Sequence, residues 1–268
     1  MKISVIIPTY KPKDYLWECL DSLVAQTFDK QEFEIILVLN GCKDPYHEKI
    51  EKYIDLHPDF CWLYIRTDEA GVSNARNLAL ERASGEYITF IDDDDYISPS
   101  YLEELYDIAS PDVVSLCYPL SFTDGTADYE QFYVTSDYKE KINNVCNYTK
   151  ARKYFSGPVY KLIHRQIIGS RRFDRSFVNG EDSIFMFLIS DRLQFVKFTS
   201  KNAIYYRRVR EDGASVRKKT VMNVIINQSR MIWKYIKIFF NHPTSYSFNF
   251  FTTRILGAIH GAFEQFGL

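Results

Sequence analysis

Four short apolar runs, separated by stretches with helical periodicity, are the feature that most constrains how this chain can fold. The runs are KISVII, FEIILVL, CWLYIR and EYITFI, at residues 2–7, 33–39, 61–66 and 86–91. Strands covered on both faces of a sheet lose the alternation of apolar and polar residues, so these runs indicate buried, parallel strands. The stretches between them have helical spacing, at residues 12–27, 44–56 and 72–83. The first half therefore predicts an α/β fold with a doubly wound, mostly parallel sheet flanked by helices.

The second half is less regular and changes character near residue 216. Further strands are expected within PDVVSLCYPLSF, LQFVKF and NAIYYRRVR, at residues 111–122, 193–198 and 202–210. Residues 123–150 are polar and look like a variable excursion. From Thr220 the pattern is helical, in two segments separated by NHPTS, which predicts a C-terminal helical extension.

This extension is basic and rich in aromatic residues, whereas the rest of the chain is acidic. Residues 216–268 hold seven Lys and Arg and one acid, a net charge of +6, and the whole chain carries −2, which leaves −8 for residues 1–215. The segment RMIWKYIKIFF suits an interfacial helix that faces anionic lipid. It equally suits helices that pack on the rest of the chain or on a second subunit. Peripheral membrane contact and homodimerisation stay open as alternatives, and we expect no nucleic-acid partner.

Cysteine usage and the lengths of the apolar runs predict a cytoplasmic location. The five cysteines are scattered and form no CxxC pair, which favours a reducing compartment. MKISVIIPTY has too short an apolar run for a signal peptide. No run reaches the roughly 18 apolar residues of a spanning helix. The inner face of the membrane is the alternative that the basic extension allows.

Three polar loops follow predicted strands, and a parallel sheet brings such loops to one edge. PTYKP follows the first strand, NGCKD the second, and the aspartates at positions 92 to 95 the fourth. Adjacent carboxylates repel, and a hard divalent cation such as Mg²⁺ or Mn²⁺ prefers oxygen ligands. The two-residue repeat of a strand would project Asp92 and Asp94 to one side. The alternative is a solvated turn in which one aspartate caps the next helix.

Two motifs of the second half also carry chemistry. NGED places Glu181 and Asp182 at a helix start, where either can act as a general base or simply favour the positive end of the helix dipole. In YYRRVREDGAS, arginines 207, 208 and 210 can pair with a diphosphate, or form an ordinary basic strand. The sequence has no GxGxxG, Walker A, GxSxG or HExxH motif.

Taken in order, these motifs resemble the family 2 inverting glycosyltransferases of the GT-A fold. The resemblance rests on VIIPTYKPKDYLWECLDSLVAQTF, LVLNGCKD and AGVSNARNLALERASGEYITFIDDDDYISP, and then on GPVYKLIHRQII, RFD, NGEDSIF and YYRRVREDGAS. It covers residues 1–216 and implies a GT-A catalytic domain there. That domain would have a nucleotide-sugar-binding half (1–118) and an acceptor-side half (119–216), followed by the extension, residues 217–268.

The resemblance also implies roles for the matching residues. Asp182 would be the general base with Glu181 beside it, and Asp94 and Asp92 would bind Mn²⁺ or Mg²⁺. Asn40 stands where many members have an aspartate that accepts the uracil N–H, a bond that an Asn carbonyl oxygen can also accept. A second departure is Lys11, where Asn is usual. The nucleotide sugar would contact Pro8, Thr9, Tyr10, Asn40, Arg76, Asp92, Asp93, Arg208 and Arg210.

The implied activity is metal-dependent transfer of a hexosyl or N-acetylhexosaminyl group in glycan synthesis. The donor would be a nucleotide sugar, expected to be a UDP-sugar, and the acceptor a saccharide or lipid-linked saccharide. One alternative is a catalytically inactive scaffold that binds sugar nucleotides within a synthesis complex. Another is a nucleotidyltransferase, although PTYKPKDY lacks the glycine-rich loop usual in those enzymes.

Overall fold

A central eight-stranded sheet organises the computed structural model, which describes residues 1–125, 129–210 and 220–266, with side chains up to residue 261. The strand order is β3-β2-β1-β4-β10-β6-β11-β9. The strands are β1 Ile3–Thr9, β2 Phe33–Asn40, β3 Cys61–Thr67, β4 Tyr87–Phe90, β6 Val113–Leu116, β9 Val145–Asn147, β10 Lys161–His164 and β11 Phe195–Phe198.

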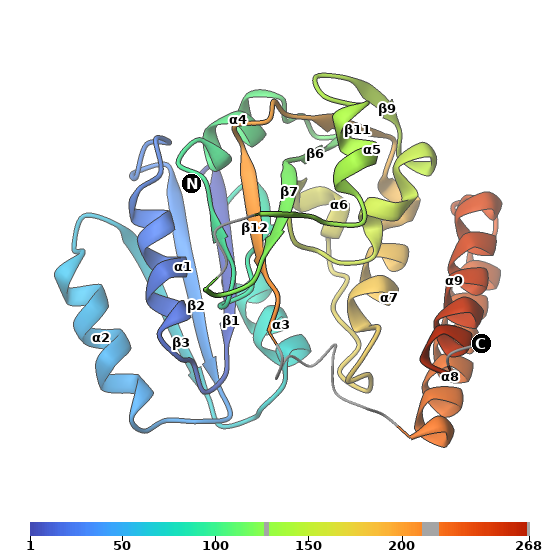
Figure 1. Ribbon diagram of the computed structural model, residues 1–268, viewed down its shortest axis with the longest axis horizontal. Coiled ribbons are helices and arrows are strands. Elements are labelled where there is room, and N and C mark those ends of the chain that lie inside the picture. The colour runs from blue at the N-terminus through green and yellow to red at the C-terminus, as the bar shows by residue number, and fades with distance from the viewer. Residues whose placement is uncertain (126–128, 211–219, 267–268) are drawn as a thin grey trace.

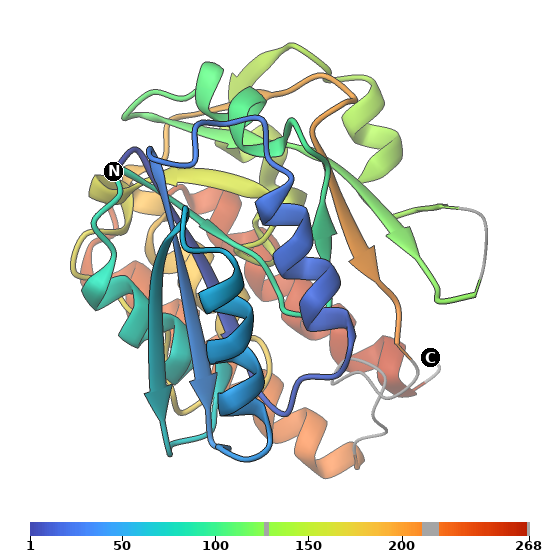
Figure 2. The ribbon, with the colours of Figure 1, turned by 90° about the vertical axis from the view of Figure 1, so that its left-hand side faces the viewer.

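The half of this sheet from β3 to β4 confirms the predicted parallel, doubly covered arrangement. All pairs among β3, β2, β1 and β4 are parallel, and every residue of β1 and β2 is buried. Helices connect these strands (Figures 1 and 2), with α3 packed on β1 and β2. The connecting helices are α1 Tyr15–Val24, α2 Tyr46–Leu56 and α3 Val72–Arg82. The carboxyl ends of β1, β2 and β4 consequently share one edge.

Beyond β4 the sheet is mixed, and one predicted strand is in fact two. Strand β10 is antiparallel to both of its neighbours, and β9 is antiparallel to β11. The expected strand 111–122 breaks at Cys117, whose N–H donates to the Tyr160 carbonyl. Its first part is β6, and its second part joins a separate four-stranded sheet of order β5-β12-β7-β8. The strands of that sheet are β5 Tyr96–Ile97, β7 Tyr118–Phe122, β8 Glu130–Gln131 and β12 Ile204–Arg208.

The two predicted C-terminal helices are present and pack against the rest of the chain. Helices α8 (Val221–Asn241) and α9 (Phe248–Phe266) lie side by side next to α7 (Glu181–Leu188). The Tyr235 hydroxyl donates to Ser183 Oγ at 2.8 Å, and the Tyr246 hydroxyl to the Leu188 carbonyl at 2.9 Å. The remaining helices are α4 Tyr101–Asp107, α5 Thr135–Lys139, α6 Arg165–Ile168 and the 3₁₀ segments η1 Tyr148–Phe155 and η2 Ser190–Arg192.

Packing on the rest of the chain covers only one side of these helices. Phe250 is fully buried, whereas Trp233, Phe240 and Leu256 are each more than 60% exposed. Within the described residues, no helix has the length and hydropathy that crossing a bilayer requires. The structure therefore bears out the intramolecular packing, while membrane contact and dimerisation stay predictions.

Candidate functional site

The ends of β1 and β2 are tied to the loop before α3 by one side chain, Asn40. Its Nδ2 donates to the Thr9 carbonyl at 2.7 Å, and its Oδ1 accepts from the Gly71 N–H at 2.8 Å. Asn40 is only 2% exposed. Its oxygen retains one further lone pair, so a bond to a base stays a prediction. Of the other residues expected in this loop, Pro8 and Thr9 are buried and Tyr10 is exposed.

The four aspartates form a turn, not the end of a strand. Strand β4 ends at Phe90, and the Asp95 N–H donates to the Asp92 carbonyl at 3.0 Å. The expectation that strand alternation projects Asp92 and Asp94 to one side is therefore wrong, because the backbone between them is not extended. Asp95 does not cap the next helix either, since Ser100 occupies that position before α4.

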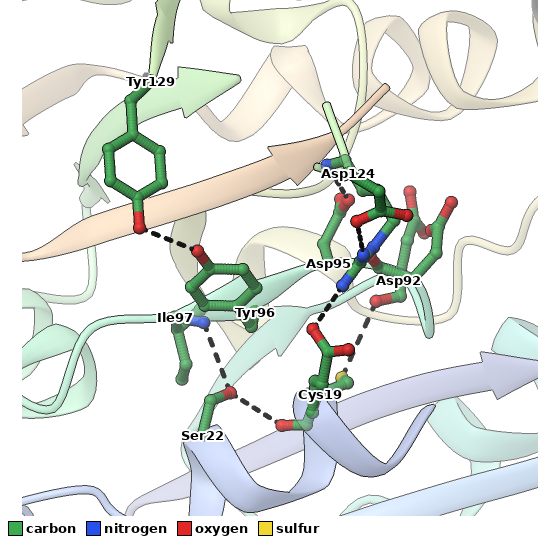
Figure 3. A network of polar contacts seen from close by, with 11 residues as sticks. Cys19, Ser22, Asp92, Asp95, Tyr96, Ile97, Asp124 and Tyr129 are labelled. Carbon is green, nitrogen blue, oxygen red and sulfur yellow. Dashed lines mark hydrogen bonds and ion pairs between the residues drawn. The ribbon is translucent and has the colours of Figure 1, made fainter. Parts of the chain in front are cut away.

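Asp95 instead fixes the turn to β12. Its carboxylate accepts from the Tyr205 hydroxyl at 2.7 Å and from the Arg208 N–H at 2.8 Å, and it is only 4% exposed. Figure 3 shows Asp92, Asp95 and Asp124 close together above the helix that carries Cys19 and Ser22. Asp95 thus sets where the other aspartates lie.

Each of the next two aspartates has a different partner. The Thr9 hydroxyl donates to Asp93 Oδ2 at 2.5 Å, and Arg210 Nε lies 2.6 Å from Asp94 Oδ2. Burial raises the pKa of Asp93 to about 7, although the Thr9 hydrogen bond opposes this. Burial, with the negative charge of Asp92, raises the pKa of Asp94 to about 6. The turn is therefore short of positive charge, and a cation or a cluster of donors would stabilise its ionised form.

Arg76 joins the aspartate turn to the NGED motif. Its Nη2 lies 2.8 Å from Asp92 Oδ1, and its Nη1 lies 2.5 Å from Asp182 Oδ1. The guanidinium is only 2% exposed and lies over the Phe173 ring at 5.3 Å. Two carboxylates 90 positions apart in the chain, whose roles were predicted from separate motifs, thus flank a single cation.

The acidic pair begins α7, as predicted, directly after Gly180 in a left-handed conformation with φ of +86°. Burial raises the pKa of Glu181 to about 7, and the charge of Asp182 adds to the effect. Glu181 Oε2 has no hydrogen-bond partner among the described residues. Burial also raises the pKa of Asp182, against the opposing effect of Arg76. Asp182 is 30% exposed, so a ligand can reach it.

Arg208 is occupied by protein groups. Its Nε donates to the Asp94 carbonyl at 2.8 Å, its Nη2 to Glu18 Oε2 at 2.6 Å, and its Nη1 pairs with Asp124. Contact with a diphosphate stays a prediction and would require these partners to change. Arg210 donates to the Tyr15 hydroxyl at 2.9 Å. The remainder of that motif, residues 211–215, lies outside the described residues.

Lys161 lies close to the candidate site and was not among the residues predicted from the sequence. It is fully buried, and its Nζ donates to the carbonyls of Gly157 and Val159 at 2.6 and 2.7 Å. These bonds hold the loop that faces Asp182, because a Cβ at Gly157 would lie 4.0 Å from Asp182 Oδ2. Burial lowers the pKa of Lys161 to about 7. A lysine inside the apolar run VYKLI was the signal in the sequence.

The donor set suits a hard divalent cation that shares its coordination with a substrate. Asp92 and Asp94 supply carboxylate oxygens, and Mg²⁺ in proteins commonly takes one or two carboxylates plus substrate phosphates. Within the described ranges, no group of three or more His, Cys, Asp or Glu side chains converges as a closed metal cage would require. The residues therefore fit an open site and not a closed one.

Comparison with known proteins now decides the family. The model of the family described as "Glycosyl transferase family 2" matches residues 4–173. The chain belongs to glycosyl transferase family 2. The glycosyltransferase GlyA of Streptococcus pneumoniae is 31% identical over 80% of this chain. The match spans 31% of GlyA, so this chain is much shorter than that relative.

Solved structures show that the fold is GT-A. The structure of residues 1–349 of TarS from S. aureus, in complex with UDP-GlcNAc, has a TM-score of 0.72 and 24% identity, and covers 89% of this chain and 67% of that one. A mannosyltransferase from Pyrobaculum calidifontis, in complex with GDP-Man and Mn²⁺, has a TM-score of 0.66 and 17% identity. It covers 97% of this chain and 69% of that one.

Proposed function

We propose that this family 2 chain is a metal-dependent inverting glycosyltransferase that moves a sugar from a nucleotide sugar to a hydroxyl group of a saccharide or lipid-linked saccharide. The observation that carries this proposal is the Arg76 bridge, because it brings the aspartate turn and Asp182 to one site. Sugar transfer needs a binding place for the diphosphate and, close to it, a base for the acceptor hydroxyl. Arg76 holds the two carboxylates close together and offsets part of their negative charge.

Asp182 is the general base in this proposal. Its partial exposure lets an acceptor hydroxyl approach, and its raised pKa makes it a stronger base than an ordinary aspartate. The hydroxyl proton passes to Asp182 as the acceptor oxygen bonds to the anomeric carbon. The bond from that carbon to the diphosphate breaks on the opposite face, so the configuration inverts. Glu181 lies beside the base. Because its pKa is raised to about 7, its carboxyl group is only partly ionised near pH 7.

Asp94 and Asp92 would hold Mn²⁺ or Mg²⁺. When bound, such a metal neutralises the charge that develops on the departing diphosphate. Arg210, which lies against Asp94, places a second positive charge beside the same region. The Mn²⁺ in the mannosyltransferase structure of the same fold supports a divalent metal.

The donor is a UDP-sugar in this proposal. UDP-GlcNAc in the similar TarS structure supports uridine, whereas GDP-Man in the mannosyltransferase makes the base worth testing. Asn40 and Tyr10 lie at the edge where the base would bind. Glycan polymer synthesis as the setting is supported by the name of a relative in Staphylococcus aureus, a poly(ribitol-phosphate) β-N-acetylglucosaminyltransferase that is 38% identical over 39% of this chain. A cytoplasmic location belongs to the same proposal.

The decisive experiment compares Asp182→Asn with wild type in an assay of UDP release from a panel of UDP-sugars. We expect the variant to lose about 10²- to 10⁴-fold of the turnover rate, the range of general-base catalysis. Donor binding, measured by calorimetry with UDP and Mn²⁺, should stay within about threefold. Asp59→Asn is the control, because Asp59 is 70% exposed and pairs with Lys30, which is not one of the candidate site residues.

Two outcomes would count against the proposal. Turnover by Asp182→Asn within about fivefold of wild type would remove Asp182 as the base. Wild-type protein that binds UDP-sugars tightly but never turns them over, with any metal or acceptor, would favour the inactive scaffold instead.

A further inference from the structure

A cleft of about 440 Å³ lies between the loop that precedes the acidic pair and the first turns of α8. Residues 178–180 form its loop side, and the last of them stands two positions before Asp182 in the chain. Met231 of α8 lines the cleft and packs against Gly180, since a Cβ there would lie 2.3 Å from its sulfur. The volume falls within the range of small-molecule sites, roughly 300–1,000 Å³.

The polar lining of this cleft is mainly carboxamide. Its four carboxamide residues are Asn179, Asn223, Asn227 and Gln228. A carboxamide offers a donor and an acceptor together, as two neighbouring hydroxyl groups do, and it carries no charge. Gln228 Oε1 is buried and has no hydrogen-bond partner among the described residues. A hydroxyl of a ligand could satisfy that oxygen once the Gln228 side chain turns it toward the cleft.

The charged and apolar residues that line the cleft also favour a neutral ligand. No carboxylate occurs among the described residues that line the cleft, and the cation among them, Arg230, already donates to the Ser176 carbonyl and lies over the Phe177 ring. Val178 and Ile226 are 86% and 49% exposed. Apolar side chains at the rim suit the C–H faces of a sugar ring, and among the described lining residues Arg230 is the group whose positive charge a phosphate could contact.

We propose that this cleft is an acceptor subsite, which binds a neutral polyhydroxyl unit, a sugar ring or an alditol. The unit would be a neighbour of the one whose hydroxyl is presented to Asp182. The inference rests on the proposed function, and it assigns acceptor recognition partly to α8, which lies outside the residues matched by the family model.

The test measures binding of small probes by saturation-transfer NMR. The neutral probes are methyl β-glucoside, methyl β-N-acetylglucosaminide and ribitol, with ribitol 5-phosphate and n-octanol as comparisons. Asn223→Trp fills the cleft from its exposed side, and Asn223→Ala removes one carboxamide. Gln166→Trp is the matched control, because Gln166 lines another cleft, of about 480 Å³, beside Met1 and Glu86 at the amino-terminal ends of β1 and β4.

At least one neutral probe should bind wild type and Gln166→Trp equally. Its signal should fall at least fivefold in Asn223→Trp and about two- to fivefold in Asn223→Ala, as expected for the loss of one hydrogen bond. The proposal is overturned if no neutral probe binds wild type, or if Asn223→Trp leaves binding intact. Preference of more than tenfold for ribitol 5-phosphate or for n-octanol would also overturn it.

Separate readouts keep this inference distinct from the proposed function. Calorimetry with UDP on the same proteins should give one dissociation constant for all of them, because Asn223 is not among the predicted donor contacts. If the probes bind as expected but UDP binds to none of the proteins, the proposed function fails while the cleft stands. Circular dichroism spectra and thermal midpoints confirm that each variant is folded.

Discussion

Replacing Arg76 by methionine should destabilise the fold through the two carboxylates that it leaves behind. Methionine keeps most of the side-chain length over Phe173 but removes the ion pairs with Asp92 and Asp182. Removing one partner of a buried ion pair costs about 3–5 kcal/mol when the remaining charge is uncompensated. Here the carboxylates are 39% and 30% exposed, so water solvates them in part. We therefore expect a smaller loss, about 1.5–3 kcal/mol in the free energy of unfolding.

Urea denaturation followed by tryptophan fluorescence measures this loss directly. In a thermal scan, the same change should lower the midpoint by about 3–12 °C, using roughly 2–4 °C per kcal/mol for chains of similar size. Arg165→Met is the control, since Arg165 is exposed and its guanidinium donates to the backbone carbonyls of Ala83 and Ser84. It should cost less than about 1 kcal/mol.

A double-mutant cycle identifies the cause of the loss. If uncompensated charge destabilises Arg76→Met, then adding Asp182→Asn to it should recover stability, because the amide is neutral. We expect a coupling free energy of about 1 kcal/mol or more. Additive effects within about 0.3 kcal/mol, or an Arg76→Met protein within about 0.5 kcal/mol of wild type, would refute the bridging role of Arg76.

Two further predictions concern the residues around Asp182. The pKa of Lys161, about 7 against an ordinary 10.5, means that the folded protein binds fewer protons than the unfolded chain between pH 7 and 10. The free energy of unfolding of wild type should therefore rise by up to about 1.4 kcal/mol per pH unit between pH 7 and 10. Urea unfolding at pH 7, 8.5 and 10 should show Lys161→Met becoming progressively less stable than wild type. A stability difference that does not change with pH would contradict this. Gly180→Ala should cost about 2–4 kcal/mol, because alanine strains the backbone at φ of +86° and its Cβ meets Met231. Gly125→Ala, with φ of +81° and no neighbouring atom of the described residues within 4 Å of the new Cβ, isolates the backbone strain at about 1 kcal/mol. Equal losses in both variants would contradict the packing argument.

Local patterns were sufficient to predict the parallel half of the sheet and the C-terminal helices. Both depend on residues close in sequence, namely continuous apolar runs and helical spacing. The division of residues 111–122 between two sheets was beyond such patterns. Tyr118 to Phe122 pair with β12, more than 80 positions later, and nothing in the run itself marks Cys117 as the place where the chain changes sheets.

The same limit applies to the site. The family resemblance implied that Asp92, Arg76 and Asp182 belong to one site, and the structure places Arg76 in contact with both aspartates. It did not predict that Arg208 is buried, because its partners Glu18 and Asp124 lie 190 and 84 positions away. Nor did it identify Asp95 as a link to β12, since that role needs the Tyr205 hydroxyl. Long-range side-chain contacts decide which members of a charged motif face a ligand.

The four aspartates show why this matters for a metal site. A divalent cation was expected to be what makes adjacent carboxylates tolerable, yet each carboxylate already has a partner from the protein. Arg76, Thr9 and Arg210 hold the first three, and Tyr205 and the Arg208 backbone hold Asp95. The protein thus gives every carboxylate of the turn a partner, although the raised pKa values of Asp93 and Asp94 show that the turn is still short of positive charge. A metal must then compete with Arg210 at Asp94, and only a ligand that brings its own phosphate oxygens makes that exchange favourable, because the displaced guanidinium can pair with the same phosphate. Metal and diphosphate should therefore bind more tightly together than either binds alone.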